Sequence, residues 1–349
     1  MHHPHKKALR PVLGAGVGLL LTSGLLAACA TQPAEKPAAD TRPAAGPASA
    51  TAAAPSGHIY VTNQQANTLS VINAQTNKVT ATVPAGTAPE GVAVSPDHSH
   101  VYIADNGSAR VSVLNTRTNK IVATVPAGKN PTGVALSPDG RYLYVANGGS
   151  DNVSVIDTRT SRVTATIPVG VSPVSLAVSR DGTAVYVANE GSANLSVIST
   201  RTDRVVRTLP AGQYPVAVAV APGGGSVYVA NEVNASVSVV STSAGRMTAT
   251  IPTGEGPFDV TLAPNGQSVY AAILGPGNVS AISTRTNRIS RTVNVGPPGT
   301  DPFNIAVTPS AVYVTDQGAD TLTVINPGSL KVTATVNVGT NPYGVAADT

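Results

Sequence analysis

Apolar and polar residues alternate along most of this chain in short runs that end at turn residues. Between residues 130 and 170, the run Pro131–Leu136 precedes the turn sequence Ser-Pro-Asp-Gly, and further apolar runs follow at 142–146, 153–156 and 163–167. Proline fixes φ at the second position of such a turn, and aspartate and glycine suit its third and last positions. The pattern predicts four antiparallel strands, a to d in chain order, each of about five residues.

The same pattern returns with a period of 42 residues. Its marker is a Tyr-Val-Thr-Asn segment, which recurs in related forms at Tyr60, Tyr102, Tyr144, Tyr186 and Tyr228, and more loosely at Tyr270 and Tyr313. The intervals between these tyrosines are 42 residues five times and then 43. A fixed period of this length is typical of repeat architectures. Seven repeats of four short strands predict an all-β fold, a seven-bladed β-propeller of four-stranded antiparallel blades.

The two ends of the repeat region complement each other. The first repeat begins at Gly57 directly with its second strand, and the chain ends with the missing first-strand segment, Pro342–Ala346. We expect this C-terminal strand to complete the first blade and close the ring, which leaves no circular edge unpaired. A solenoid, the alternative architecture, would need polar caps at both ends.

The first 28 residues are typical of a secretory signal peptide. A basic start with Lys6, Lys7 and Arg10 precedes an apolar stretch that ends in Leu-Ala-Ala before Cys29,. Cys29 is the single cysteine, so an intrachain disulfide is excluded,. Its position resembles a bacterial lipobox, which implies cleavage before Cys29 and lipid attachment to its thiol. An ordinary signal cleavage nearby is the alternative.

Residues 29–56 are rich in Ala, Pro, Thr and Ser and predict a partly extended tether, after which residues 57–349 form the propeller,. We therefore expect an exported protein that is anchored by lipid at the extracellular face of the cell membrane. Loss of the signal would remove three of the 22 basic residues and leave 19 against 18 acidic ones. Whole-chain charge therefore indicates no particular partner.

The repeat resembles that of the YVTN family of β-propeller proteins. The similarity covers residues 57–349 and rests on Pro-x-Gly-Val-Ala-Val-Ser-Pro-Asp-Gly, Tyr-Val-Ala-Asn, Ser-Val-Ile-Asp-Thr and Val-Ala-Thr-Val-Pro-Val-Gly. The resemblance implies an exported or cell-surface protein, like surface-layer-associated members or YncE-like periplasmic propellers for which DNA binding is suggested. It supplies no shared catalytic motif. The chain departs from the pattern at Ala271–Ile273 and in the longer loop 296–301.

The strand order sorts the loops onto two faces of the disc. If strand a runs from face X to face Y, the a–b and c–d turns lie on face Y, and the b–c loops and d–a crossovers lie on face X. Basic residues recur in the c–d turns, so face Y is a candidate surface for an anionic polymer such as DNA or a wall polymer. The candidates are Arg117, Lys120, Arg159, Arg162, Arg201, Arg204, Arg285 and Arg288. The alternative is that these residues keep the rim soluble and were copied with the repeat.

Acidic residues gather in the segments assigned to face X, where the residue after the strand-a proline lies near the axis. This position holds Thr or Val in three repeats, and the next position is usually Gly, Ala or Ser. Aromatic and polar side chains occur instead at Glu90, Phe258, Asp259, Phe303, Asn304 and Tyr343. This crescent is a candidate ligand site. The alternative is that its bulky side chains plug the mouth of the channel.

No catalytic or cofactor motif emerges from the sequence. A Cys-x-x-Cys-His haem site needs two cysteines, tryptophan is absent, and no Gly-x-Ser-x-Gly motif marks a nucleophile,. We therefore expect no metal, no cofactor and no catalytic residue. The favoured function is a monomeric binding protein of the cell envelope that presents loops to an unknown protein or glycan. The alternatives are binding of an anionic polymer through face Y and a lactonase- or lyase-like enzyme at the axis.

Overall fold

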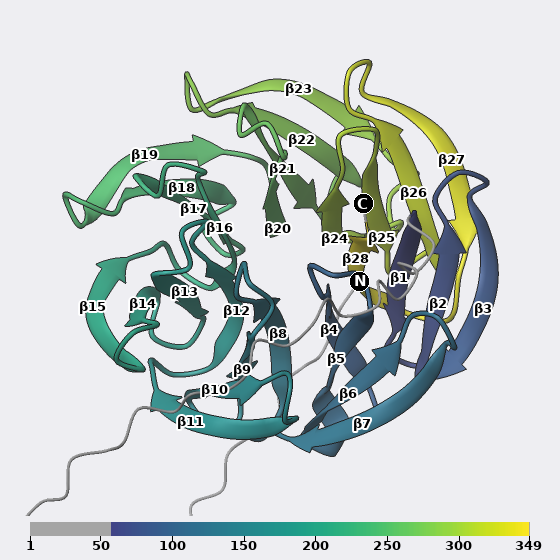
Figure 1. The fold of residues 1–349 in the computed structure, drawn as a ribbon. Helices are drawn as coiled ribbons and strands as arrows, with labels where there is room; N and C mark the ends of the chain where they lie inside the picture. The colour runs from purple at the N-terminus through teal and green to yellow at the C-terminus, as the bar shows by residue number, and fades with distance from the viewer. Residues whose placement is uncertain (1–56, 349) are drawn as a thin grey trace, which may run out of the picture. The chain divides into compact units, whose positions relative to one another are not determined.

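The computed structural model describes residues 57–348, which form seven four-stranded antiparallel sheets arranged in a ring (Figure 1). The prediction of an all-β seven-bladed propeller is confirmed. One 3-10 turn, η1 (Asn106–Ser108), is the only helical element among these residues. The predicted signal peptide, Cys29 and the tether lie outside the described residues. Among those described, no helix is long and apolar enough to cross a bilayer.

The four strands of each blade follow one another from the axis to the rim. From the innermost strand outward, blade 1 contains β28 (Pro342–Asp348), β1 (His58–Asn63), β2 (Thr68–Asn73) and β3 (Lys78–Pro84), and blade 2 contains β4 (Pro89–Val94), β5 (His100–Asp105), β6 (Arg110–Asn115) and β7 (Lys120–Pro126). Blade 3 contains β8 (Pro131–Leu136), β9 (Tyr142–Asn147), β10 (Asn152–Asp157) and β11 (Arg162–Pro168), and blade 4 contains β12 (Pro173–Val178), β13 (Ala184–Asn189), β14 (Asn194–Ser199) and β15 (Arg204–Pro210). Blade 5 contains β16 (Pro215–Val220), β17 (Ser226–Asn231), β18 (Ser236–Ser241) and β19 (Arg246–Pro252). Blade 6 contains β20 (Pro257–Leu262), β21 (Ser268–Ile273), β22 (Asn278–Ser283) and β23 (Arg288–Asn294), and blade 7 contains β24 (Pro302–Val307), β25 (Val312–Asp316), β26 (Thr321–Asn326) and β27 (Lys331–Asn337).

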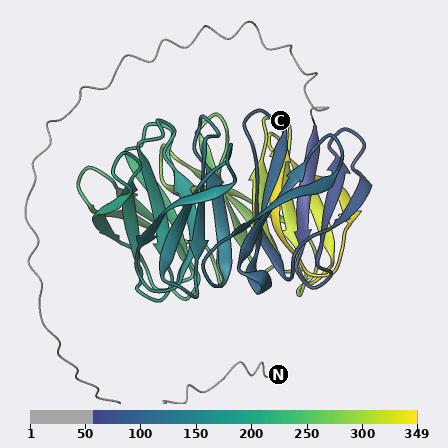
Figure 2. The same cartoon turned by 60° about the horizontal axis from the view of Figure 1, so that its bottom comes forward.

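The hydrophobic core lies between neighbouring blades. The two middle strands of each sheet are buried almost along their whole length, because both of their faces are covered by the adjacent sheets,. Tyr144 and Val153 of blade 3, for example, pack with Leu176 and Val185 of blade 4. The outer strands expose most of their residues, and Figure 2 shows how the strands run between the two faces of the disc.

A buried polar side chain ends the second strand of six blades and explains the Asn of the repeat motif. In blade 3, Asn147 Oδ1 accepts a 3.1 Å hydrogen bond from Gly128 N, and its Nδ2 donates to Ser154 Oγ at 2.9 Å. Because Gly128 belongs to the crossover from blade 2, this side chain fixes the crossover against the blade that it enters. Blade 6 has Ile273 at this position.

The ring closes as the sequence predicts. Strand β28 pairs with β1 in antiparallel register, so the two ends of the described chain share one sheet. Asp348 adds side-chain bonds to this pairing, because its Oδ1 accepts from Gly57 N at 2.6 Å and from His58 N at 2.8 Å. Gly339 N also donates to Asn63 Oδ1 at 3.0 Å, which holds the last crossover against blade 1.

Replacing Asp348 by Ala tests the importance of this closure. The variant leaves the amides of Gly57 and His58 without their side-chain acceptor, which we expect to lower the free energy of unfolding by about 1–3 kcal/mol. Urea unfolding followed by circular dichroism measures the change. The matched control is Thr340→Ala, at an exposed position in the crossover between β27 and β28. Equal stability of the two variants would contradict this role of Asp348.

Candidate functional site

Four of the predicted site residues follow the first proline of an inner strand and lie at the face X end of the ring. Glu90 belongs to β4, Phe258 to β20, Phe303 to β24 and Tyr343 to β28. These strands belong to blades 2, 6, 7 and 1, which are consecutive around the closed ring. The residues therefore form one arc at the axial mouth, which we call the axial cluster.

The aromatic members of the axial cluster pack against one another. The rings of Phe258 and Phe303 stack with centroids 3.8 Å apart, and Tyr343 meets Phe303 edge to face at 4.6 Å. Phe303 is buried, whereas Phe258 and Tyr343 are half-buried. Such contacts contribute beyond simple burial of apolar area. The three rings thus form a preformed apolar wall with part of its surface open.

Glu90 is the carboxyl group next to this wall and is only 7% exposed. Its Oε1 accepts a 2.8 Å hydrogen bond from Gln64 Nε2, whereas Oε2 is buried without a hydrogen bond of standard geometry. Burial raises the pKa of Glu90 to about 7, although Gln64, Asn106 and Tyr343 act in the opposite direction,. Glu90 can therefore change charge near neutral pH.

Asp259 and Asn304 point between blades, and their oxygens bind backbone amides. Asp259 Oδ2 accepts from Ile305 N of blade 7 at 2.7 Å, and Asn304 Oδ1 accepts from Val345 N of blade 1 at 3.1 Å. Burial raises the pKa of Asp259 to about 7, against the effect of its backbone hydrogen bonds. Both side chains tie neighbouring inner strands together directly behind the aromatic wall.

Three further residues near the mouth had no distinctive signal in the sequence. Gln64 and Asn106 act on Glu90 from the b–c loops of blades 1 and 2. Glu190, in the b–c loop of blade 4, joins Glu90 and Asp259 in raising the pKa of Tyr343 well above its ordinary value, although burial is the largest cause. Membership of a face X loop was the only feature that could have suggested them.

The acidic character of face X is smaller than a count of its residues suggests. Asp105 and Asp316 are fully buried, because they occupy the position of Asn147 and bind Ser112 and Thr323 within their own blades. The acidic residues that the sequence assigns to face X include these two, and for them the expectation of an acidic surface is wrong because their carboxyl groups are buried. Glu190, Glu232 and Glu255 remain at least partly exposed on this face.

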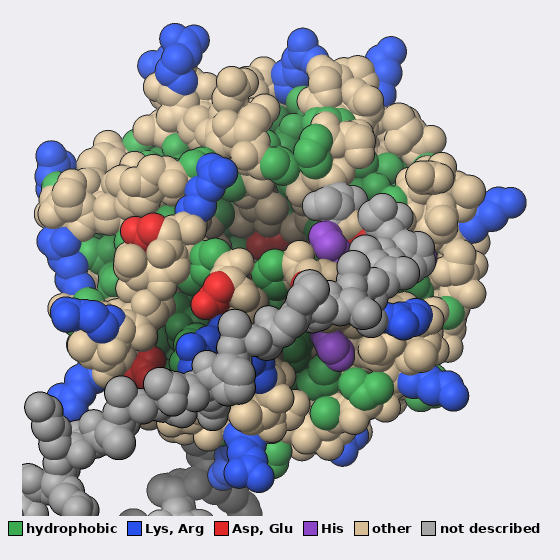
Figure 3. All heavy atoms as spheres, in the orientation of Figure 1, with side chains coloured by type: hydrophobic (Ala, Val, Ile, Leu, Met, Phe, Trp, Pro, Cys, Tyr) green, Lys and Arg blue, Asp and Glu red, His purple; other side chains and the backbone are tan. Residues whose placement is uncertain are grey.

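The eight basic candidates of face Y are all exposed: Arg117, Lys120, Arg159, Arg162, Arg201, Arg204, Arg285 and Arg288. In blade 3, Asp157 Oδ1 accepts from Arg159 N at 3.0 Å and thereby shapes the turn that carries this arginine outward,. Figure 3 shows Lys and Arg side chains at intervals around the outer edge of the disc instead of in one patch. The repeat therefore spreads its positive charge over the whole rim.

No group of three or more His, Cys, Asp or Glu side chains is placed to hold a metal ion within residues 57–348. His98 lies in the a–b turn of blade 2, and His100 is the first residue of β5 directly after this turn. The backbone amide of His98 donates to Ser95 O at 2.8 Å, and His100 Nδ1 lies 2.7 Å from Ser99 Oγ.

Comparisons with known families agree with this architecture. A family model described as a YNCE-like beta-propeller matches residues 31–139, and one described as a 7-bladed beta-propeller lactonase matches residues 115–206. Each covers less than half of the chain. A stretch of 42 residues is 60% identical to the PE-PGRS family protein PE_PGRS18 of Mycobacterium tuberculosis (strain ATCC 25618 / H37Rv), which is 12% of this chain and 9% of that protein. The stretch is as long as one repeat.

Solved structures share the fold at low sequence identity. A functionally unknown protein from Desulfotomaculum acetoxidans DSM 771 has a TM-score of 0.72 and 17% identity, over 83% of this chain and 98% of that one. Hydrazine synthase of Kuenenia stuttgartiensis has a TM-score of 0.67 and 23% identity, over 73% and 88% of the two chains. The dihydro-heme d1 dehydrogenase NirN gives 0.63 and 16%, over 83% and 75%. The chain is thus a seven-bladed propeller similar to YncE-like proteins.

The raised pKa of Glu90 predicts a pH dependence of stability. An acid with a pKa of 4.5 when unfolded and about 7 when folded loses its proton more readily after unfolding. The native protein should therefore lose stability as the pH rises from about 5 to about 8, by on the order of 3 kcal/mol from this group. Glu90→Gln stays neutral, so we expect it to lose less stability over this interval in urea unfolding. Exposed Glu255→Gln is the control, and identical pH profiles for wild type and Glu90→Gln would refute the assignment.

Proposed function

We propose that this protein is an exported, lipid-anchored binding protein of the cell envelope that presents face X to a partner and catalyses no reaction. The observation that carries the proposal is the axial cluster, in which an aromatic wall and the Glu90 carboxyl meet at one mouth of a rigid ring. Cys29 and the tether residues 29–56 would hold the ring at the membrane.

The chemistry of the axial cluster favours a cationic group on the partner. Aromatic faces and a carboxylate together attract Lys or Arg side chains, and partial burial strengthens this attraction. The raised pKa of Glu90 is consistent with the absence of a nearby cation among the described residues, and a bound cation would lower it,. Between a protein and a glycan, this argument favours a protein that inserts a basic side chain.

A lactonase- or lyase-like enzyme is the alternative at the same place. It is supported by the lactonase family match to residues 115–206 and by two carboxyl groups with pKa values of about 7, Glu90 and Asp259. Asp259, however, already binds the backbone amide of Ile305. Lactone turnover that disappears in Glu90→Gln would favour the enzyme over the binding protein.

The binding role can be tested with synthetic peptides that carry a single exposed Lys or Arg, and with matched peptides that carry Glu. We expect the basic peptides to bind the wild-type protein in calorimetric titrations, and Glu90→Gln or Phe258→Ala to weaken them by about tenfold. Arg201→Glu on the opposite face is the control and should leave affinity unchanged. Equal affinity for basic and acidic peptides, or no effect of the first two substitutions, would count against the axial cluster.

Binding of an anionic polymer through face Y is a second candidate, favoured by the eight exposed basic residues of the c–d turns. For this function we expect affinity for duplex DNA or anionic wall polymer to fall linearly with the logarithm of salt concentration. The combined substitution of Arg117, Arg159, Arg201 and Arg285 by Glu should abolish binding, and Glu90→Gln should not. Absence of binding at low salt would leave the rim charges as a solubility feature.

A further inference from the structure

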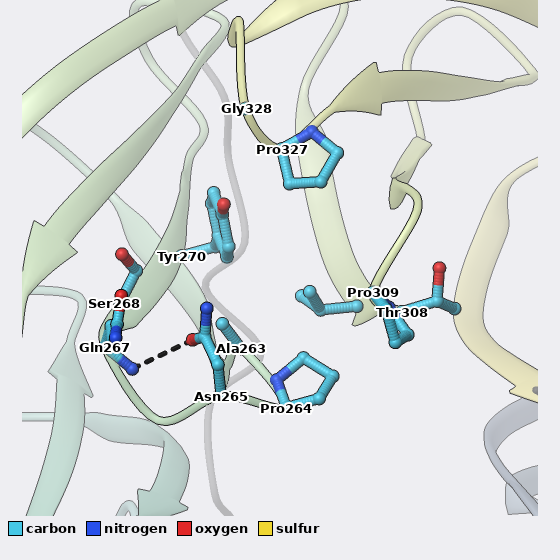
Figure 4. A pocket seen from close by; sticks show the side chains of 11 residues that line it. Ala263, Pro264, Asn265, Gln267, Ser268, Tyr270, Thr308, Pro309, Pro327 and Gly328 are labelled. Atoms are coloured by element: carbon cyan, nitrogen blue, oxygen red, sulfur yellow. Dashed lines mark hydrogen bonds between the residues drawn. The ribbon is translucent and has the colours of Figure 1, made fainter.

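Clefts recur on face Y where the turns of neighbouring blades meet, and one differs from the others in its lining. The cleft between blades 2 and 3, of about 690 Å³, is lined by charged residues that include Asp97, Asp139 and Arg141. The cleft between blades 6 and 7 has a volume of about 650 Å³, and none of its eleven lining residues is charged (Figure 4). Both volumes fall in the range of roughly 300–1,000 Å³ that is usual for ligand sites.

A shortened turn distinguishes the cleft between blades 6 and 7. The a–b turn of blade 6 closes with a hydrogen bond from Ala263 N to Ser268 O, whereas that of blade 7 closes from Thr308 N to Ala311 O and is two residues shorter. In blades 3, 4 and 6 the turn glycine reaches a proline of the preceding blade, and a β-carbon on Gly140 would lie 3.0 Å from the ring of Pro96. The turn of blade 7 has no glycine, so Pro264 lacks this neighbour.

The Tyr270 hydroxyl in this cleft has no hydrogen-bond partner within residues 57–348, a property that it shares with the equivalent hydroxyls of Tyr186 and Tyr313. In blade 5 the hydroxyl of Tyr228 donates to Asn287 Oδ1 at 2.9 Å, but Leu330 occupies the position of Asn287 in blade 7 and cannot accept from Tyr270. Figure 4 shows Tyr270 between the 263–268 turn and the turn that contains Pro327 and Gly328. The side-chain amide of Gln267 and the hydroxyl of Ser268 line the same cleft.

We propose that the cleft between blades 6 and 7 binds a neutral saccharide. A sugar combines hydroxyls that donate and accept with apolar C–H faces, and the cleft offers hydroxyl and amide groups beside the rings of Pro264, Pro309 and Pro327,. No lining residue carries a charge, although Arg291 Nη1 donates to the carbonyl oxygen of Gly328 at 3.5 Å. A neutral ligand fits this lining better than a charged one, which would leave water without an opposite charge among the lining side chains. This site lies on the face opposite the axial cluster, so it is independent of the proposed function.

The experiment is a calorimetric titration of the purified protein with cellotriose, maltotriose and chitotriose, with duplex DNA as the anionic comparison. We expect saturable binding of at least one trisaccharide, and a loss of about tenfold in affinity for Tyr270→Phe. Gly328→Trp should abolish binding by filling the cleft. A side chain is tolerated there, because a β-carbon on Gly328 would meet only Asn326 Oδ1, at 3.5 Å, and its φ is not in the left-handed region.

Arg201→Trp is the matched control, since it places the same ring at the equivalent position of the c–d turn in blade 4, and it should leave affinity unchanged. Glu90→Gln should also leave it unchanged, which separates this site from the axial cluster. Absence of binding by all three trisaccharides, or equal affinity in wild type, Tyr270→Phe and Gly328→Trp, would overturn the proposal. Tyr270→Phe removes a single oxygen and keeps the test valid if the tryptophan variant does not fold.

Discussion

The pairing of β28 with β1 is the interaction on which the rest of this structure depends. It joins the two ends of the described chain in one sheet and closes the ring. Every blade is therefore covered on both faces by a neighbouring blade, and no terminal blade exposes an apolar face to solvent. Because the core lies between blades, opening the ring would expose to solvent the apolar faces that the closed ring buries. The buried acceptor Asp348 and the bond between Gly339 and Asn63 reinforce this junction.

A closed ring forces the seven inner strands together at the axis, and small residues make this approach possible. A β-carbon on Gly91 would lie 2.2 Å from the carbonyl oxygen of Thr132 in the next blade, so a side chain there would require the backbone to move. Asp259 and Asn304 occupy the equivalent position in blades 6 and 7, and they bind the amides of the next inner strand. Asp259 and Asn304 directly follow Phe258 and Phe303 in the chain, so both departures from the repeat occur in the same two blades and make the axial mouth asymmetric.

Two local departures from the repeat therefore place distinct chemistry on opposite faces of one rigid body. On face X, bulky residues after the strand-a proline form the axial cluster around Glu90. On face Y, a shortened turn in blade 7 leaves an uncharged cleft beside Tyr270. The regular repeats supply the scaffold, and the candidate sites lie where the repeat is broken.

The sequence by itself determined the blade count, the strand order and the closing strand, because the register within a repeat is local. It also determined the grouping of Glu90 with the three aromatic residues, because the period fixes which positions are equivalent. Tertiary structure decided that Asp105 and Asp316 are buried and that Asp259 and Asn304 bind backbone amides across blades. It also decided that Glu190 contributes to the raised pKa of Tyr343. It also showed that a shorter a–b turn in blade 7 offsets part of the longer crossover within the 43-residue interval. These features depend on how adjacent blades meet, and the distances between blades are set by the closed ring and not by the pattern within any one repeat.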